Sequence, residues 1–416
     1  MNKTFTLTLL TAACSASLAQ TVPANTVTVY GILDGGVQRV SGYAGGANTS
    51  VVSGIMEGSR FGFRGNEDLG GGWRALFTME HRAELNTGST SNRPPSGSQV
   101  PDRLNQAALL GLPAALQPAV SGVAGSIGGT LGVNLANNFW DRQIYVGLVT
   151  PYGAVLAGRQ YTPAYETSAA FDIMGTQSSL SAGQAASIPS SIDIRVSNAV
   201  QYRIVLGGLT AGAMYAFGTV AGNSAANRFG GVMAQYRMGD LAVGAAYNRK
   251  NNDLGLRSLT STVIGASYDI GPGKVSGMVA KYKDDNPSGV STIAAGLTPL
   301  VGAAGAALVQ GAFTNALRQD AQFFHLGYKL TTGPNTFYVA YTSANDKRAP
   351  NADVASYGAA YSYALSKRTD LNAVFTHFDN KNLAQAAPGQ AGFLGGVTAT
   401  AGTDANSLAF GIRHRF

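Results

Sequence analysis

Cysteine is almost missing from this 416-residue chain, whose single one, Cys14, lies close to the N-terminus. An internal disulfide is therefore excluded. Cys14 fits a lipoprotein cleavage site only loosely, because Thr11 stands where leucine is preferred. Charged residues are also scarce, at 12% of the chain, roughly half the share of ordinary soluble proteins. Hydrophobic residues make up 45%, with 18 Tyr and 17 Phe, so the sequence is not that of a disordered protein.

The N-terminal apolar run, residues 5–13, is too short to span a membrane as a helix. It follows a single cation, Lys3, and precedes small residues, which together predict a signal peptide over residues 1–19 with cleavage after Ala19. Cleavage removes Lys3 and no acid, so the formal charge of +7 falls by one to +6 in residues 20–416. The mature protein is expected to be exported and free of thiols.

Catalytic and metal-binding patterns are also missing. The four histidines, His81, His325, His377 and His414, are far apart and lack the spacing of metal ligands. The chain has no phosphate-binding loop, no hydrolase nucleophile elbow and no dinucleotide fingerprint. A serine and a histidine could still meet in space, but the sequence predicts no enzyme, no metal and no cofactor.

A strict alternation of side chains is the strongest positive signal. The last ten residues, Ser407–Phe416, alternate apolar side chains with small or cationic ones, and Arg413 and Arg415 share the polar face. Successive side chains of a strand point to opposite faces, so one face suits lipid and the other water. Similar segments of about ten residues fill the chain, which is typical of a transmembrane β-barrel.

Sixteen such segments are predicted, joined in turn by short, mostly glycine-containing turns and by long connections. Turns at one end and loops at the other are expected of a membrane barrel, whose strand number is even. The predicted strands are Thr26–Val40, Ile55–Leu69, Trp73–Leu85, Phe139–Val149, Ala154–Tyr161, Arg195–Leu206, Leu209–Phe217, Phe229–Met238, Leu241–Lys250, Leu259–Ile270, Lys274–Lys283, Ala321–Leu330, Thr336–Ser343, Ala355–Leu365, Asp370–Phe378 and Asn406–Phe416.

Two long connections, residues 104–138 and 290–317, are uncharged and rich in Ala, Gly and Leu. Interior prolines, Pro113 and Pro118 in the first and Pro299 in the second, argue against one long helix in either. Each could be a mobile external loop, a contact with a neighbouring subunit or a cover over a pore mouth. The sequence leaves these alternatives open.

Arginine dominates the cations, with 20 of the 29, and most stand singly inside alternating segments. Within Trp73–Leu85, for example, Arg74, Glu80 and Arg82 share one strand face. Nucleic-acid binding would instead call for a clustered basic surface. Charges confined to one strand face predict a water-filled barrel interior.

Several motifs, in this order along the chain, resemble the general porins of Gram-negative outer membranes, in the form found in β-proteobacteria. They are Ser59–Gly70 (SRFGFRGNEDLG), Asp141–Leu148 (DRQIYVGL), Gly158–Tyr161 (GRQY), Arg195–Tyr202 (RVSNAVQY) and the terminal Phe416. The resemblance covers essentially the whole mature chain. It implies a sixteen-stranded barrel that is usually trimeric, with the third external loop folded into the lumen as a constriction. It also implies that the terminal aromatic is the signal read by the barrel-insertion machinery.

Matched to this chain, the constriction loop spans residues 162–194, with Glu166, Asp172 and Asp193 as its only ionisable groups. The resemblance implies a ladder of wall arginines opposite such acids. Arg60, Arg142 and Arg195 match it by motif; the less certain additions, taken from strand face and position, are Arg39, Arg64, Arg74 and Arg159. Each arginine could also be a solvated lumen residue or the partner of a nearby acid. Because residues 176–191 carry no charge, cations outweigh anions and the channel is predicted to prefer anions.

The predicted function is passive diffusion of small hydrophilic solutes and ions across the outer membrane. Expected partners are two further copies of the chain in a homotrimer, outer-membrane lipid and lipopolysaccharide, the barrel-insertion machinery, and small anions, but no nucleic acid. Alternatives are a substrate-specific channel for an anionic metabolite and a structural or adhesive barrel acting through its loops. A soluble propeller or sandwich is disfavoured because no repeat of about forty residues is present.

Overall fold

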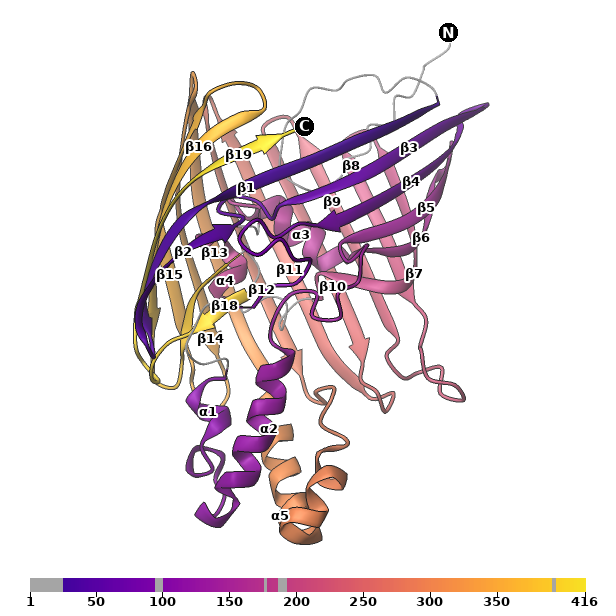
Figure 1. Cartoon of the computed structure of the whole chain (residues 1–416). Coiled ribbons are helices and arrows are strands. Elements are labelled where there is room, and N and C mark those ends of the chain that lie inside the picture. Colours follow the sequence, from indigo (N-terminus) through magenta and orange to yellow (C-terminus); the bar gives the residue numbers. More distant parts are fainter. Residues whose placement is uncertain (1–24, 94–99, 176–177, 186–192, 391–393) are drawn as a thin grey trace.

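The computed structural model describes residues 25–93, 100–175, 178–185, 193–390 and 394–416. The predicted signal peptide, residues 1–19, lies outside them. Within these ranges one antiparallel sheet closes on itself into a barrel (Figure 1). Its strands are Thr26–Tyr43 (β1), Gly46–Ser53 (β2), Arg60–Gly70 (β3), Trp73–Arg82 (β4), Gln143–Thr150 (β5), Gly153–Tyr161 (β6), Arg195–Leu206 (β7), Leu209–Ala216 (β8), Phe229–Met238 (β9), Leu241–Asn251 (β10), Arg257–Ile270 (β11), Gly273–Asp284 (β12), Gln319–Thr332 (β13), Asn335–Asp346 (β14), Val354–Ala364 (β15), Thr369–Asn380 (β16) and Ala405–Arg415 (β19).

The barrel has sixteen strand positions, because β2 and β3 share one of them. The first half of β1, from Thr26 to Ile32, pairs with β3, and its second half, from Gly35 to Tyr43, pairs with β2. Between β2 and β3 the chain leaves the wall over residues 54–59. The prediction of one strand over Ile55–Leu69 is therefore wrong for residues 55–59, and β2 was not predicted. All sixteen predicted segments nevertheless overlap a strand.

The barrel closes where its first strand meets its last. β1 pairs with β19 from Ile32–Arg415 to Val40–Ser407. Beyond this ladder, the Gly31 and Phe416 backbones each donate an N–H to the other's carbonyl, both at 3.1 Å. A Cβ on Gly31 would lie 2.3 Å from the Phe416 ring, so the glycine makes room for the aromatic. The C-terminal residue is thus part of the closing seam, and no sheet edge is left unpaired there.

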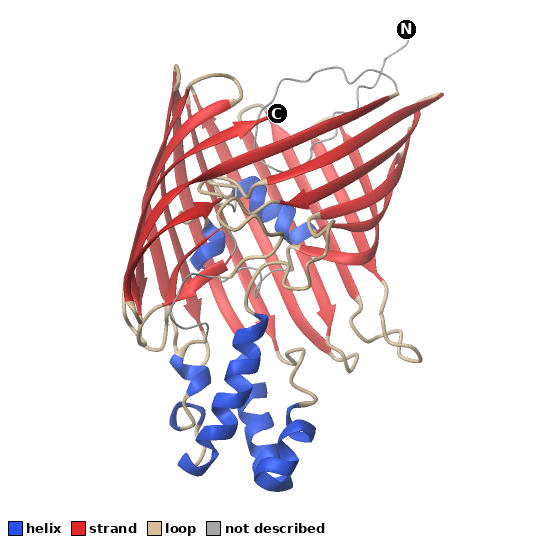
Figure 2. Ribbon diagram, viewed as in Figure 1, coloured by secondary structure: helices blue, strands red, loops and turns tan. Residues whose placement is uncertain are grey.

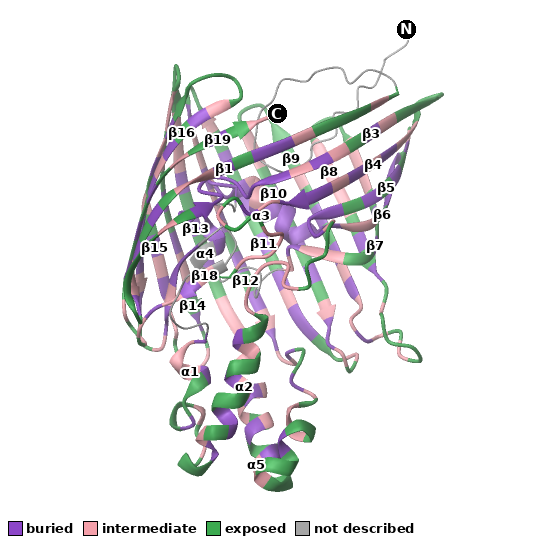
Figure 3. Ribbon diagram, viewed as in Figure 1, coloured by how far each residue is buried: buried purple, intermediate pink, exposed green. Residues whose placement is uncertain are grey.

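Burial alternates along the strands, as Figure 3 shows. Apolar side chains cover the outer face, including Val29, Val279 and Phe324, each more than 40% exposed. Tyr202, Tyr236, Tyr247 and Tyr268 are exposed on this face as well. An outer face of this composition can contact hydrocarbon and its boundary.

The start of β1 and the C-terminus lie at the end of the barrel that carries the short turns, and the long loops lie at the other end (Figures 1 and 2). Between β4 and β5 come the helices Asp102–Asn105 (α1), Ala108–Leu110 (η1), Ala114–Leu116 (η2) and Gln117–Thr130 (α2). Between β12 and β13 lies Ile293–Leu317 (α5). A small hairpin of Ala386–Gln390 (β17) and Leu394–Val397 (β18) precedes β19.

The two long uncharged connections, left open by the sequence, form helices that pack on each other outside the barrel. Val120 and Ala124 of α2 share a buried cluster with Val309 and Phe313 of α5. With a mean hydropathy of 1.6, α5 has the length and composition of a membrane span. Gly302, with φ of 72°, breaks it into two shorter pieces, in line with the expectation that no single long helix forms.

The loop between β6 and β7 turns into the barrel. It carries the helices Pro163–Phe171 (α3) and Ala182–Ala185 (α4), and both lie within the ring of strands in Figure 2. Thr162 caps α3 by accepting a hydrogen bond from the Tyr165 backbone N–H, and Pro163 occupies the first turn, where no partner for its nitrogen is needed. α3 packs against β9, β10, β11 and β12.

Candidate pore-lining site

One side of the inner wall gathers arginines around a single glutamate, Glu80 of β4. Its Oε1 accepts a hydrogen bond from Arg142 Nε at 2.6 Å, and its Oε2 lies 3.5 Å from Arg60 Nε. Tyr30 of β1 donates its hydroxyl to Oε2 at 3.1 Å. The strand register explains why these side chains meet. Arg60 is opposite Arg82, which is two residues from Glu80 on the same strand face. Glu80 is opposite Gln143, the residue after Arg142. Strand pairing alone thus brings two separate motifs onto one carboxylate.

Tyr161, at the end of β6, extends this group to Arg195. Its hydroxyl accepts from Arg142 Nη2 at 3.1 Å and from Arg195 Nη2 at 2.8 Å. The Arg195 guanidinium also lies 4.5 Å from the centre of the Tyr161 ring, within range of a cation–π contact. On its other side Tyr161 stacks on Tyr165 of α3 with ring centres 5.0 Å apart. The third loop therefore touches the arginines through aromatic rings.

A second acid, Glu57, stands in the segment that leaves the wall between β2 and β3. Asp34 of β1 holds this segment: its carboxylate accepts the backbone N–H groups of Ile55, Met56 and Glu57 at 2.7 to 3.0 Å. Ser59 reinforces the turn by donating its hydroxyl to the Asp34 carbonyl at 2.9 Å. These bonds replace the strand ladder, which is why residues 55–59 do not continue β3.

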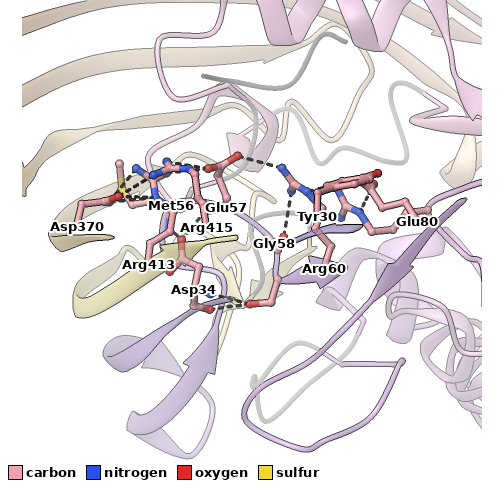
Figure 4. Close-up of polar contacts among 12 residues, drawn as sticks. Tyr30, Asp34, Met56, Glu57, Gly58, Arg60, Glu80, Asp370, Arg413 and Arg415 are labelled. Carbon is pink, nitrogen blue, oxygen red and sulfur yellow. Dashed lines mark hydrogen bonds and ion pairs between the residues drawn. The ribbon is translucent and has the colours of Figure 1, made fainter. Parts of the chain in front are cut away.

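Glu57 joins the two ends of the barrel sequence. Its Oε1 lies 3.1 Å from Arg60 Nη2, while its Oε2 lies 3.0 Å from Arg413 Nη1 and 3.1 Å from Arg415 Nη2. Figure 4 shows its carboxylate between Arg60 on one side and the two arginines of β19 on the other. Asp370 of β16 completes this group with contacts of 2.8 Å to each of Arg413 and Arg415.

We call these eight residues the arginine network: Arg60, Arg142, Arg195, Arg413, Arg415, Glu57, Glu80 and Asp370. Five cations minus three acids leave a formal charge of +2. Arg142 is fully buried, whereas the Arg415 side chain keeps 25% of its surface exposed and Arg195 is half-buried. The water-facing members of the network are therefore cationic.

The opposite inner wall is built to hold the third loop. Glycines on β9, β10, β11 and β13 leave space where its side chains come close. A Cβ on Gly265 would lie 2.3 Å from Phe171, and one on Gly327 would lie 2.3 Å from Ile173. The Phe171 carbonyl accepts from the Ser276 hydroxyl at 2.8 Å, and the Ile173 N–H donates to His325 Nε2 at 3.2 Å. The glycines of this wall thus determine where the third loop lies.

The three acids of this loop contact partners outside the arginine network. Glu166 pairs with Arg203 of β7, and Asp193 Oδ1 lies 3.0 Å from Lys250 Nζ of β10. Asp172 accepts backbone N–H groups from Met174 at 2.8 Å and Ala182 at 2.9 Å. Part of the uncharged stretch 176–191 lies outside the described residues.

The arginines named from the sequence divide into those inside and those outside the network. Arg60, Arg142 and Arg195 come together in it. Arg64 lies beside it, 3.8 Å above the Tyr30 ring. Arg159 donates to the Asp141 carbonyl at 2.6 Å and to Ser197.

Arg39 and Arg74 lie apart from the network. Arg39 is exposed on the same outward face as Val37 and donates to the Thr49 hydroxyl at 3.0 Å. Arg74 is one residue from the start of β4, next to the short turn 70–72. Both are therefore remote from the middle of the inner wall, where Arg60 and Arg142 meet.

Sequence reasoning missed the acids and the tyrosines of the site. Glu57 stands two residues before the Ser59-Arg60 motif, and Glu80 was seen only as one charge on a strand face. Arg413 and Arg415 were placed toward water, but nothing in the sequence indicated that they share Glu57 with Arg60. No cluster of three metal-ligand side chains occurs within the described ranges.

A closed antiparallel barrel with an apolar outer face and a charged inner wall defines a transmembrane β-barrel channel. A model of the Gram-negative porin family matches residues 6–383, and the chain belongs to that family, a family of outer-membrane channels.

The chain is 24% identical to outer membrane porin protein 32 of Delftia acidovorans, with 100% of both chains covered. Among solved structures, the anion-selective porin from Comamonas acidovorans superposes with a TM-score of 0.67 at 22% identity, covering 94% of this chain and all of that one. In-vitro folded OmpT of Vibrio cholerae, described as the trimer form, has a TM-score of 0.59 at 14% identity, covering 95% of this chain and 100% of the other.

Proposed function

We propose that this porin is a diffusion channel for small hydrophilic solutes and ions that prefers anions. The observation that carries the proposal is the imbalance of the arginine network, in which five arginines meet three acids. The acids of the third loop do not correct it, because Glu166, Asp172 and Asp193 bind elsewhere.

The physical reason is electrostatic. A passing ion is in water, but the wall behind the arginines is a low-dielectric sheet that directs their field into the lumen. The charges of buried pairs such as Arg142 with Glu80 nearly cancel, whereas the partly exposed Arg195 and Arg415 present their charge to the lumen. Anions are concentrated there and cations are repelled.

Three further points belong to this proposal. The relative from Comamonas acidovorans is named as anion-selective, which agrees with the charge of the network. The OmpT structure described as a trimer form supports a homotrimer for this chain. The proposal also includes lipopolysaccharide as a lipid partner and recognition of Phe416 by the insertion machinery. In addition, it makes the third loop the narrowest part of the lumen.

Reversal potentials of the purified protein in planar bilayers under a salt gradient test the selectivity. We expect a potential whose sign corresponds to a higher permeability for chloride than for potassium. Because screening shortens the reach of surface charge, the preference should fall as the salt concentration rises. A clear cation preference would refute the proposal, while saturable block by one solute would favour a substrate-specific channel instead.

A further inference from the structure

Two cations stand on the outward, lipid-facing side of β10 and β12, the strands on either side of β11, near the long-loop end of the barrel. Arg249 lies on the outer face of β10, which it shares with Val243 and Tyr247. Lys281 lies on the outer face of β12, two residues beyond Val279, which is 50% exposed. The inward direction of the alternate residues is clear, since Asn248 and Ser276 both bond to the third loop.

Strand pairing brings these cations into one patch. Arg249 is opposite Thr260 of β11, which is opposite Lys283 of β12, two residues after Lys281. Neighbouring strands are about 4.8 Å apart and residues two apart along a strand about 7 Å, so the three cations lie within roughly 12 Å. Lys281 is flanked on either side by Thr262 and Gln322. We call Arg249, Lys281 and Lys283 the outer basic patch.

The patch retains a net positive charge after its acids are counted. Lys283 Nζ lies 3.5 Å from Asp285, and Asp320 of β13 is opposite Lys283 in the register. Arg257 also lies 3.7 Å from Asp285. In the ranges that the structure describes, neither Arg249 nor Lys281 makes an ion pair or a side-chain hydrogen bond, and both are exposed. Two cations therefore face outward without a counterion from the protein.

A groove of about 450 Å³ runs beside Lys281 along β11 to β14. Toward the long-loop end it is lined by Lys281, Gln322 and Asn345, and toward the middle of the barrel by Ile264, Val279 and Phe324. Its two ends thus differ in polarity along the membrane normal. This is the shape that an amphiphile with an anionic head and an apolar tail would fill.

We propose that the outer basic patch binds the phosphorylated headgroup of an outer-leaflet lipid, with an acyl chain in the groove below. The long loops of outer-membrane barrels face outward, so this end of the wall meets the outer leaflet. A cation on a lipid-facing surface near the interface is stabilised when an anionic headgroup accompanies it. The proposal depends on the outer-membrane location and is independent of ion selectivity.

Native mass spectrometry of the delipidated full-length protein in detergent tests the proposal, with bis-phosphorylated lipid A as the probe and its fully dephosphorylated form as comparison. Each basic residue near an anionic lipid surface contributes about 1 kcal/mol, or roughly fivefold in affinity. We expect Lys281→Gln to weaken lipid A binding by about fivefold and the double variant with Arg249→Gln by about 25-fold, since the terms add.

Lys381→Gln is the matched control, because it removes an exposed cation from the same end of the barrel next to β16, where Asp379 is its partner. It should bind lipid A like the unchanged protein, and Lys281→Arg should retain most of the affinity. Unchanged heat-modifiable mobility of each variant shows that the barrel is folded.

Equal binding of the dephosphorylated lipid, or equal losses in Lys281→Gln and Lys381→Gln, would overturn the proposal. So would loss of binding on chelation without any effect of Lys281→Gln, which indicates cations bridging lipid phosphate to Asp285 and Asp320.

Discussion

The two halves of the inner wall are built in opposite ways. The half formed by β3–β7 with β16 and β19 carries large charged side chains that bind one another in the arginine network. The half formed by β9–β13 carries glycines, and the third loop lies on it with Phe171 against Gly265 and Ile173 against Gly327. Bulk is therefore supplied by long side chains on one half and by a separate chain segment on the other.

The difference explains where charge can act on a permeating ion. The loop acids have their own cationic or backbone partners, as Glu166 has Arg203 of β7 and Asp193 has Lys250 of β10. On the charged half, three carboxylates are shared among five arginines, and Glu57 alone contacts three of them. Uncompensated positive charge is thus concentrated on one side of the lumen.

Deletion of Phe416 should have the largest effect, because the charged half contains the closing seam. The deletion removes two backbone hydrogen bonds to Gly31, each worth about 1 kcal/mol, and exposes strand edges to lipid. We expect the amount of folded barrel in the outer membrane to fall several-fold, with unchanged single-channel conductance in the barrels that do assemble. Phe416→Ala, which keeps the backbone bonds, separates their loss from loss of the ring. Normal assembly of the deletion variant would show that the seam does not need this residue.

Replacing Arg60, Arg142 and Arg195 together by Gln should remove the charge difference between the two halves. The network charge then changes from +2 to −1, since three cations are lost. A unit charge about 8 Å from the ion path in water is worth about 0.5 kcal/mol, and screening in about 0.1 M salt roughly halves this value. Because each charge acts with opposite sign on anions and cations, the loss of three cations should lower the anion-to-cation permeability ratio by about tenfold. Conductance should rise because the shorter side chains leave more room.

This variant leaves the buried Glu80 without Arg60 and Arg142, its two arginine partners. An unpaired buried acid can lower the free energy of unfolding by about 3 kcal/mol or more. Adding Glu80→Gln removes that acid and brings the network charge to zero. The fourfold variant should also lose most of the anion preference that reversal potentials report. Retention of full preference in both variants would place the selectivity outside the arginine network.

A larger side chain at a glycine that contacts the third loop tests the glycine half without any change of charge. In Gly265→Leu the new side chain occupies the place of Phe171, so the loop must move away from the wall. We expect a lower and noisier single-channel conductance with little change in reversal potential. Gly230→Leu is the matched control on β9, where a Cβ would meet nothing within 4 Å. Equal conductance of both variants would mean that the loop does not narrow the lumen.

Glu57→Gln should have the smallest effect, in the opposite direction to the loss of the arginines. The network charge rises from +2 to +3, and the anion-to-cation permeability ratio should increase roughly twofold. Glu67→Gln on the neighbouring β3, exposed and outside the network, should leave the ratio unchanged. A decrease of the ratio in Glu57→Gln would mean that Glu57 holds the arginines in place more than it neutralises them.

Much of the wall could be read from the alternation of residues, because strand geometry converts a period of two directly into two faces. The outward Val279 and Phe324 and the closing segment Ser407–Phe416 are examples. The departure of residues 55–59 from the wall could not be predicted in this way, because their local pattern is compatible with a strand. Only the Asp34 carboxylate, 21 to 23 residues earlier in the chain, takes its N–H groups away from the ladder.

The amino-acid sequence was enough to predict the number of wall positions, the polar and apolar faces and, through the family motifs, the grouping of Arg60, Arg142 and Arg195. These depend on local periodicity and on short motifs, which do not change with the fold around them. The pairing of acids with arginines depends on the folded barrel, since Glu57 and Arg413 are 356 residues apart in the chain. The same holds for the position of the third loop on the glycine wall and for the outer basic patch, which comes from β10 and β12. Contacts of that kind arise from strand register across the closed barrel, and no local pattern encodes them.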